Sequence, residues 1–429
     1  MKIIRSRRVP ASLKMPVSIP VPALKLPRTM SFHCPEIIIV VLYFIYCVIH
    51  TCSATEFAQV IPKFATLGKL CDYGVIMGLL CTYLMYGKIR MKAGLGICVS
   101  AVLTLFAAKF GHSMTESVML MLFMLCGIKL KSDLMMQMFF RVTTFLVAVT
   151  ALFSIVGIFH MDIAINEGRV PRYYFGFTFT TYVANYFFHL LFVYFYLRQK
   201  IEFKDTVIIM ILNYLIYKYT DTRAVFYGVI LMVAVLWLSQ WKPKLFSLKL
   251  FGIGCTLFMP FMAGLMLWLC VSYTLRNRTL ANLNEALSGR LELGHRAIQK
   301  YGYPLFGTDV QWVTGRAGFE RTKEYFYVDS SYINGMVTLG VVIMVIMILG
   351  FSLMSWKAYK NKNTFLCIIL LFLAIHGFTD PQLISLKYNP FLLLLGKVFL
   401  TGDDIQLDGK IKNISDYIQQ ILRKWKKAA

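Results

Sequence analysis

Long, uninterrupted apolar runs constrain this chain more than any other feature. Segments such as 250–271 and 332–356 are almost continuously apolar, without the alternation typical of strands. Lipid offers no partner for backbone amides and carbonyls, so a spanning segment must satisfy them internally, as a helix does. The chain is 58% hydrophobic and only 15% charged, whereas soluble proteins carry about a quarter charged residues. The sequence therefore predicts an all-α, polytopic membrane protein.

The hydropathy pattern predicts about twelve transmembrane helices. We place them near residues 36–54, 73–87, 93–108, 117–128, 138–159, 182–197, 206–217, 224–240, 250–271, 332–356, 365–378 and 389–400. Nine spans thus fall within 36–271 and three within 332–400, with a hydrophilic loop at 272–331 between them. The other loops are short and contain no glycine-rich phosphate-binding motif, which argues against ATP-driven transport within this chain.

Lysine and arginine residues predict the orientation. They accumulate on one set of alternate loops, and the positive-inside rule places that set in the cytoplasm. Both termini are then cytoplasmic, which agrees with an even number of spans. The net charge of +24 follows this pattern, so we expect membrane lipid rather than nucleic acid as its partner.

The two ends of the chain are hydrophilic. Residues 1–35 are basic and contain five prolines between Pro10 and Pro27, which predicts a cytoplasmic leader without regular structure. Residues 401–429 place isoleucines at helical spacing between lysines, with Trp425 near the end. That pattern predicts an amphipathic helix on the anionic inner leaflet.

The loop at 272–331 is the only sizeable hydrophilic segment between spans, and parity places it outside. Its leucines recur at helical spacing and predict two amphipathic helices, with a break near Ser288-Gly289-Arg290. The loop departs from the positive-inside trend because it contains eight cations, six of them arginine (Arg276, Arg278, Arg290, Arg296, Arg316 and Arg321). Arginine suits bidentate phosphate binding, but salt bridges or lipid headgroups would also explain these residues.

A second external arginine favours the phosphate interpretation. Asp221-Thr222-Arg223 lies in a very short outer turn between two spans. An arginine this close to hydrocarbon is costly unless it faces a cavity, a partner or the interface. Pairing with Asp221 or contact with headgroups is the alternative explanation.

Other outer segments supply candidate acid, base and binding groups. They are Arg169 and Arg172 after the fifth span, His295 and Tyr301 in the loop, Asp329 and Tyr332 at its end, and His376 and Asp380 after the eleventh span. A single histidine at a helix end is more often a packed polar residue than a catalyst.

The chain resembles the Wzy-type polysaccharide (O-antigen) polymerases, within the wider polymerase–ligase group. Besides the span number and the late outer loop, the resemblance rests on Asp221-Thr222-Arg223, Leu287-Ser288-Gly289-Arg290-Leu291, Tyr301-Gly302, Leu305-Phe306-Gly307, and Asp329-Ser330-Ser331-Tyr332 with Gly340. It covers roughly the second half of the chain, whereas the first half matches only in hydropathy. The catalytic histidine of the related ligases has no clear counterpart.

The resemblance implies transfer of a glycan from undecaprenyl pyrophosphate to the terminal sugar of another lipid-linked repeat unit. Arg223 and Arg290 would stabilise the leaving pyrophosphate without a metal or other cofactor, supported by Arg278 and Arg296. Asp329, or else His376, would be the general base, and a weakly activated mechanism with no strong base stays open. Arg169, Arg172, Asp221, His295, Tyr301, Tyr332 and Asp380 are the expected substrate-binding residues. A chain-length regulator and a flippase of the same pathway are the expected protein partners.

Three alternatives stay open at this point. A ligase that transfers finished polymer to another acceptor is the nearest, and the sequence barely separates it from a polymerase. A flippase or carrier is the non-enzyme alternative, but carriers usually show repeated halves and polar sites at mid-membrane. A scaffold role leaves the clustered arginines unexplained.

Overall fold

The computed structural model describes residues 34–86, 114–128, 132–165, 170–314 and 325–400. Five expectations from the sequence lie outside these residues. They are most of the leader at 1–35, the span at 93–108, the tail at 401–429, the substrate-binding role of Arg169, and part of the loop at 272–331.

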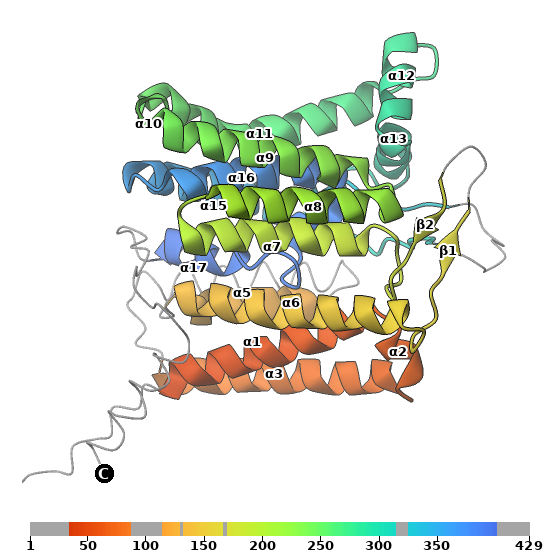
Figure 1. Ribbon diagram of the computed structural model, residues 1–429, viewed down its shortest axis with the longest axis vertical. Helices are drawn as coiled ribbons and strands as arrows, with labels where there is room; N and C mark the ends of the chain where they lie inside the picture. Colours follow the sequence, from red (N-terminus) through yellow and green to blue (C-terminus); the bar gives the residue numbers. More distant parts are fainter. Residues whose placement is uncertain (1–33, 87–113, 129–131, 166–169, 315–324, 401–429) are drawn as a thin grey trace, which may run out of the picture.

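The described chain is all-helical apart from one short hairpin. The helices are α1 (Cys34–Cys52), α2 (Phe57–Val60), α3 (Phe64–Tyr86), α5 (Met114–Gly127), α6 (Ser132–Ile155), α7 (Tyr182–Arg198), α8 (Phe203–Thr220), α9 (Arg223–Trp241), α10 (Pro243–Phe246), α11 (Lys249–Ser272), α12 (Arg278–Ala286), α13 (Arg290–Tyr301), α14 (Ser331–Thr338), α15 (Val341–Lys360), α16 (Thr364–Thr379) and α17 (Leu392–Leu400), with a 3₁₀ turn at Pro381–Ile384. Strands β1 (Ile163–Ala164) and β2 (Arg172–Tyr173) pair antiparallel. The long helices lie side by side, and their connections gather at two opposite ends (Figure 1).

Five of the described helices are long and apolar enough to cross a membrane. They contain the segments Phe64–Leu84, Ser132–Ile155, Arg223–Trp241, Lys249–Ser272 and Val341–Lys360. Three shorter apolar helices accompany them, at Glu36–Cys52, Val118–Gly127 and Thr364–Thr379. The helices are those of a membrane-embedded protein.

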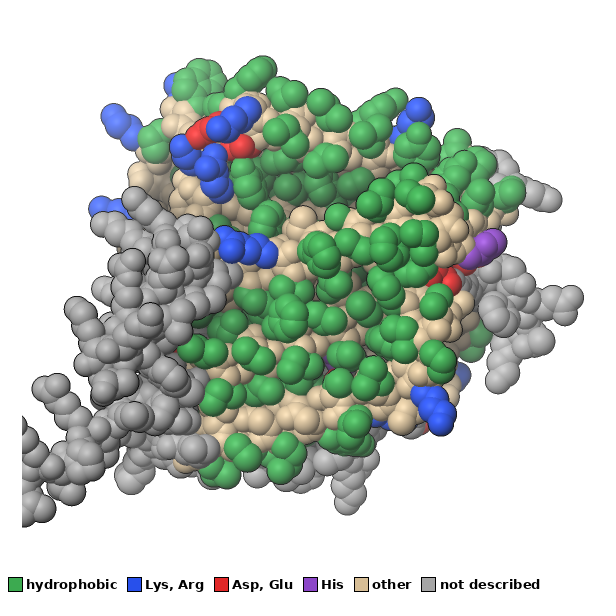
Figure 2. Space-filling model, turned by 60° about the horizontal axis from the view of Figure 1, so that its bottom comes forward, with side chains coloured by type: hydrophobic (Ala, Val, Ile, Leu, Met, Phe, Trp, Pro, Cys, Tyr) green, Lys and Arg blue, Asp and Glu red, His purple; other side chains and the backbone are tan. Residues whose placement is uncertain are grey.

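The outer surface of the bundle is apolar, as a lipid-facing surface must be. Ile208, Ile211 and Leu215 on α8 and Leu231 on α9 are exposed although they lie on long helices. Hydrophobic side chains cover much of the visible face, and Lys and Arg lie mainly toward its ends (Figure 2). A soluble protein of this size would bury such side chains.

Helix α16 lies in the middle of the packing. It contacts α7, α9, α11 and α15, and side chains such as Ile368 and Ile369 are fully buried. Because α16 is apolar on all sides, neighbours surround it completely. It ends at Thr379, and Asp380 follows directly at the end of the bundle that carries α12 and α13.

The span expected at 332–356 is broken into α14 and α15. The break lies at Gly340, whose φ of +98° is a region that favours glycine. Backbone groups at the break form hydrogen bonds with the loop instead: Val341 N–H donates to Pro304 O at 2.9 Å, and Thr308 N–H donates to Val337 O at 2.9 Å. The hydropathy pattern continues through the break and therefore gives no sign of it.

The two helices expected between 272 and 331 are present as α12 and α13. Ser288 and Gly289 have φ values of 57° and 84°, and these left-handed residues separate the two helices. In Figure 1 α12 and α13 stand beside the hairpin end of the bundle, steeply inclined to the long helices.

Candidate functional site

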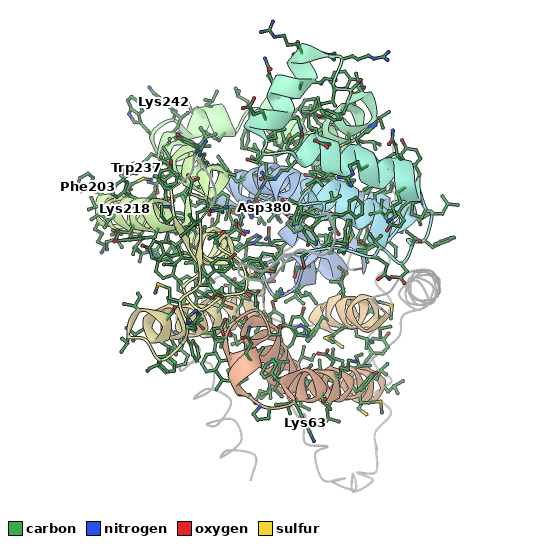
Figure 3. All side chains as sticks on the ribbon, turned by 90° about the vertical axis from the view of Figure 1, so that its right-hand side faces the viewer. Lys63, Phe203, Lys218, Trp237, Lys242 and Asp380 are labelled. Atoms are coloured by element: carbon green, nitrogen blue, oxygen red, sulfur yellow. The ribbon has the colours of Figure 1, made fainter. Side chains whose placement is uncertain are left out.

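A large cavity opens at the end of the bundle that carries α12, α13 and the β-hairpin. Its volume is about 1890 Å³, against roughly 300–1,000 Å³ for a typical small-molecule pocket. Its walls come from α1, the hairpin, the α8–α9 turn, the α12–α13 break, the segment before α14 and the turn after α16. Seen from this end, Asp380 lies near the middle of the bundle, whereas Lys63 and Phe203 lie at its edge (Figure 3).

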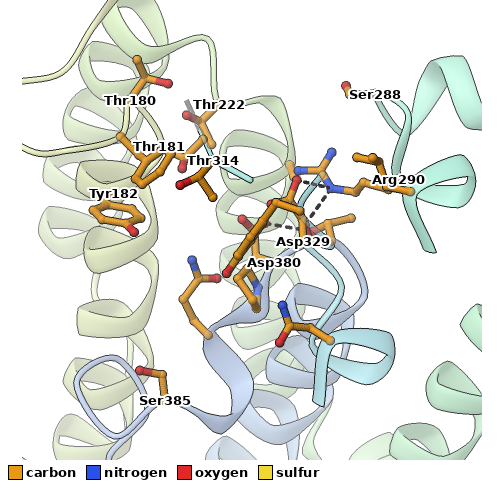
Figure 4. A pocket seen from close by; sticks show the side chains of 18 of the residues that line it. Thr180, Thr181, Tyr182, Thr222, Ser288, Arg290, Thr314, Asp329, Asp380 and Ser385 are labelled. Carbon is orange, nitrogen blue, oxygen red and sulfur yellow. Dashed lines mark hydrogen bonds and ion pairs between the residues drawn. The ribbon is translucent and has the colours of Figure 1, made fainter. Parts of the chain in front are cut away.

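Backbone carbonyls anchor Arg290 in the cavity wall. Its Nε–H donates to Thr379 O at 2.7 Å, and one Nη1–H donates to Leu287 O at 3.0 Å. The side chain is 18% exposed, and Nε lies 3.8 Å from Asp329 Oδ2. Two carbonyls therefore fix the guanidinium in orientation, and the carboxylate lies beside it (Figure 4).

The α12–α13 break places Arg290 at the first position of α13. Asn284 stabilises this arrangement because its Oδ1 accepts hydrogen bonds from the N–H groups of Leu291 and Glu292, at 3.0 and 3.1 Å. Its Nδ2 in turn donates to the Tyr273 hydroxyl at 3.2 Å. The amide of Asn284 thus caps α13 although it lies on the preceding helix. The sequence gives no sign of this cap, because an N-cap residue usually stands directly before its helix.

Two carboxylates, Asp329 and Asp380, lie beside Arg290. Ser331 joins the segments that carry them, since its hydroxyl donates to Asp380 O at 2.5 Å and accepts from Leu383 N–H at 3.1 Å. The Asp380 carboxylate accepts from Asn185 Nδ2 at 3.2 Å and from the Thr379 hydroxyl at 3.1 Å. Asp380 is held on several sides, whereas Asp329 is open to the cavity.

The surroundings of both carboxylates disfavour their ionised forms. Burial raises the pKa of Asp329 to about 6, the Arg290 guanidinium opposes this rise, and the nearby Asp380 adds to it. Burial likewise raises the pKa of Asp380, against the effects of Arg290 and the hydrogen bonds from Asn185 and Thr379. Perturbed carboxylates in a large cavity are typical of acid–base sites.

The α8–α9 turn supplies a second cationic group. Asp221 ends α8 in the left-handed region, with φ of 46°, and its carboxylate lies 3.3 Å from Arg223 Nε. The Arg223 side chain is 67% exposed. Arg172 of β2 donates from Nε to Thr220 O at 2.8 Å, at the carboxyl end of α8. Arg172, Asp221 and Arg223 therefore come together, and all three line the cavity.

Aromatic side chains line much of the remaining wall. They are Tyr46, Tyr174, Phe179, Tyr182, Tyr227, Trp312, Tyr325, Tyr327 and Tyr388. The Trp312 ring packs edge-on against Tyr327 with centroids 5.2 Å apart. Such rings offer apolar faces next to hydroxyl groups, a combination that suits sugars.

Six of the residues singled out in the sequence do not line this cavity. His376 is buried on α16, with Nδ1 3.7 Å from Asp380 Oδ2. Tyr332 is buried and donates to Ala374 O at 2.8 Å. His295 contacts Cys270 O through Nδ1 at 2.8 Å.

The other three lie on α12 and α13. Arg278 is exposed at the first position of α12. Arg296 lines a separate, smaller cavity of about 440 Å³ with Lys300 and Phe326. Tyr301 packs on the Phe326 ring at 6.3 Å. By contrast, Arg172, Asp221, Arg223, Arg290, Asp329 and Asp380 all line the large cavity.

The sequence pattern did not single out His50 and Asp72, which meet at the α1 side of the cavity. His50 Nε2 lies 2.8 Å from Asp72 Oδ1. They lie on different helices, 22 residues apart, so no local spacing connects them.

Among the residues that the structure describes, no group of three or more His, Cys, Asp or Glu side chains has the arrangement of a metal site.

No protein-family model, curated protein or solved structure matches the chain. The site's own geometry is therefore the basis for a functional proposal.

Proposed function

We propose that this protein is a membrane glycosyltransferase that joins undecaprenyl-pyrophosphate-linked oligosaccharide repeat units into a surface polysaccharide. The observation that carries the proposal is the meeting of Arg172, Arg223 and Arg290 with Asp329 and Asp380 in one large cavity. These residues come from five separate segments of the chain. The motif resemblance to Wzy-type polymerases, which includes Arg223, Arg290 and Asp329, supports the same reaction.

The cationic side of the cavity suits a pyrophosphate leaving group. During transfer the bond between the anomeric carbon and the phosphate oxygen breaks, and negative charge develops on the pyrophosphate. Guanidinium groups held in place before the reaction stabilise such charge without reorganisation. Arg290 fits this role because two carbonyls already fix its orientation, and the exposed Arg223 can move to meet the phosphate.

Asp329 suits the acceptor side of the same reaction. The acceptor hydroxyl forms the new bond to the anomeric carbon and loses its proton, which needs a base within reach. Asp329 faces the cavity, and a pKa of about 6 leaves most of it ionised at neutral pH. His376 lies behind Asp380 and does not reach the cavity, so we assign the base to Asp329.

The proposal includes a location and an orientation. We place the protein in the cytoplasmic membrane of a bacterium, with twelve spans, both termini in the cytoplasm and the cavity on the outer face. The distribution of lysine and arginine supports this orientation, because Lys242, Lys244 and Lys249 lie in or beside α10, at the end opposite the cavity. A flippase and a chain-length regulator would act with it.

Replacement of Arg290 tests the proposal. In cells that lack the native chain, we expect Arg290→Ala to reach the membrane but to lower chain extension by about 10²–10³-fold, the usual effect of removing one such donor. Single repeat units should accumulate on lipid, as gel electrophoresis of the glycans would show. Arg223→Ala should act in the same direction.

Arg276→Ala is the matched control. Arg276 lies in the same outer segment and is exposed, but it does not line the cavity. Normal chain length in both Arg290→Ala and Arg223→Ala would refute the polymerase. Long polymer that stays unattached to its final acceptor would instead indicate a ligase, and movement of lipid-linked units by the purified protein alone would indicate a flippase.

A further inference from the structure

The second titratable pair of the cavity lies on its α1 side, away from the arginines. Asp72 belongs to α3, within the apolar segment Phe64–Leu84 that is long enough to span a membrane. A carboxylate in such a helix is costly and usually marks a functional site. Its partner here is His50 of α1, with Nε2 2.8 Å from Asp72 Oδ1 and side chains 16% and 17% exposed, respectively.

Asp72 determines which nitrogen of the His50 ring is left for a ligand. An ionised carboxylate only accepts hydrogen bonds, so the proton of the neutral ring lies on Nε2. Nδ1 then carries a lone pair, and among the described residues no protein group bonds to it. Tyr46 packs on the ring at 4.2 Å between centroids and keeps it in place. His50 and Tyr46 both line the cavity, whereas Asp72 lies behind them.

The cavity has two sides, one at Arg290, Asp329 and Asp380 and the other at His50. Helices α1 and α3 lie at the bottom of Figure 1, whereas α12 and α13 lie at the top. Residues of both ends line the same cavity, from Tyr46 and His50 to Ser288 and Arg290. Its volume of about 1890 Å³ exceeds that of a single small-ligand pocket. A reaction between two oligosaccharides needs room for both the donor and the acceptor, and the His50 side provides room for the second of them.

We propose that the His50 side of the cavity is a sugar-binding subsite, in which Nδ1 of His50 accepts a hydrogen bond from a hydroxyl of the acceptor oligosaccharide. The inference rests on the proposed function and adds a place for the second substrate. Tyr46 and Tyr388 also line the cavity, but both are buried, so the recognition proposed here depends on the His50 nitrogen. His50 is a binding residue here, and Asp72 is the positioning residue that orients its ring.

The test uses the full-length protein in nanodiscs and two probes. The first is the repeat-unit oligosaccharide, released from its lipid by mild acid and labelled at the reducing end; it binds through sugar contacts alone. The second is undecaprenyl pyrophosphate without a glycan, which reports on the arginine side. We expect both probes to bind the unaltered protein.

His50→Gln is the decisive variant. The glutamine amide can still donate to Asp72 in place of Nε2, but it removes the ring nitrogen that faces the ligand. We expect the oligosaccharide to bind about tenfold more weakly, the effect of one lost hydrogen bond at a part-buried site. Affinity for undecaprenyl pyrophosphate and the melting temperature should stay unchanged. Asp72→Asn, which removes the charge that selects the tautomer, should weaken oligosaccharide binding by a smaller factor.

His160→Gln is the matched control. His160 pairs with Asp162 at 3.3 Å on the same end of the molecule, but it is 82% exposed and does not line the cavity. Unchanged oligosaccharide affinity in His50→Gln would overturn the subsite, as would a wild-type protein that binds no released oligosaccharide. If undecaprenyl pyrophosphate fails to bind the wild-type protein, the proposed function itself is in error, whatever the oligosaccharide does.

Discussion

Asp329 illustrates how single residues set the properties of the cavity. Burial raises its pKa from the ordinary value of 3.8 to about 6, the neighbouring Arg290 lowers it, and Asp380 raises it. Since the fold disfavours the ionised form, the protonated form stabilises the protein relative to the charged one. That contribution is fully present below about pH 4 and is lost as the pH rises through about 6.

Replacement of Asp329 by asparagine should show how much stability the protein loses when Asp329 ionises. The amide imitates the neutral carboxyl group, so Asp329→Asn should melt at a higher temperature than the wild-type protein at pH 8. The difference should shrink through pH 6 and vanish near pH 4, as melting curves of the detergent-solubilised protein at several pH values would show. A shift of two pKa units corresponds to less than about 3 kcal/mol, and solvent at a side chain that is 32% exposed reduces it further. A variant that is less stable at pH 8 would contradict the assigned direction.

Some residues of the candidate site could be predicted from the sequence, and others could not. Arg290 could be singled out because a Ser-Gly break precedes it, and Arg223 because it lies in a very short turn between apolar runs. Both line the cavity. The pairing of His50 with Asp72 could not be predicted, because it depends on how α1 packs against α3. The burial of His376 behind Asp380 likewise follows from tertiary packing.

At the scale of elements, two glycines lock the segment before α14 to the start of α15. A Cβ on Gly340 would meet Gly307 N at 2.4 Å and Leu305 O at 2.5 Å, and a Cβ on Gly307 would meet Thr338 O at 2.2 Å. Both glycines have positive φ, 98° and 84°. Backbone atoms cannot move aside as a flexible side chain can, so neither position has room for a larger residue.

Gly340→Ala should therefore destabilise the protein. Left-handed strain and backbone overlap together cost more than about 2 kcal/mol, and we expect the melting temperature to fall by several degrees. Gly254→Ala in α11 is the control, because nothing lies within 4 Å of its Cβ position and alanine is the better helix former. Equal melting temperatures for the two variants would show that the close packing at Gly340 is not needed.

The elements also show what hydropathy can and cannot predict. The apolar runs predict α7, α9, α11 and α16 to within a few residues, because length and composition decide whether a helix can lie in lipid. They do not predict the break at Gly340, because both sides of it are apolar. The position of that break depends on the loop that supplies hydrogen bonds to it.

At the scale of the whole molecule, clusters of charged residues mark the end of the bundle opposite the cavity. Arg198, Lys200 and Lys204 cluster with Glu202 and Asp205 at the start of α8. Helix α10, flanked by further lysines, lies at the end opposite α12 and α13 (Figure 1). By the positive-inside rule, we propose that the α10 end is cytoplasmic and the cavity end external. A substrate carried on undecaprenyl pyrophosphate would then meet the cavity only after it has crossed the membrane.

Two single cysteines test this orientation in a variant whose ten native cysteines are replaced by alanine. Ser288→Cys lies at the exposed α12–α13 break, and Ser247→Cys is exposed beside α10. A membrane-impermeant maleimide should modify the first in intact spheroplasts, and the second only after the membrane has been permeabilised. The opposite pattern would place the cavity in the cytoplasm, where the polymerase proposed here could not act. Labelling of Ser288→Cys should also slow once undecaprenyl pyrophosphate is added, since Ser288 lines the same cavity as Arg290.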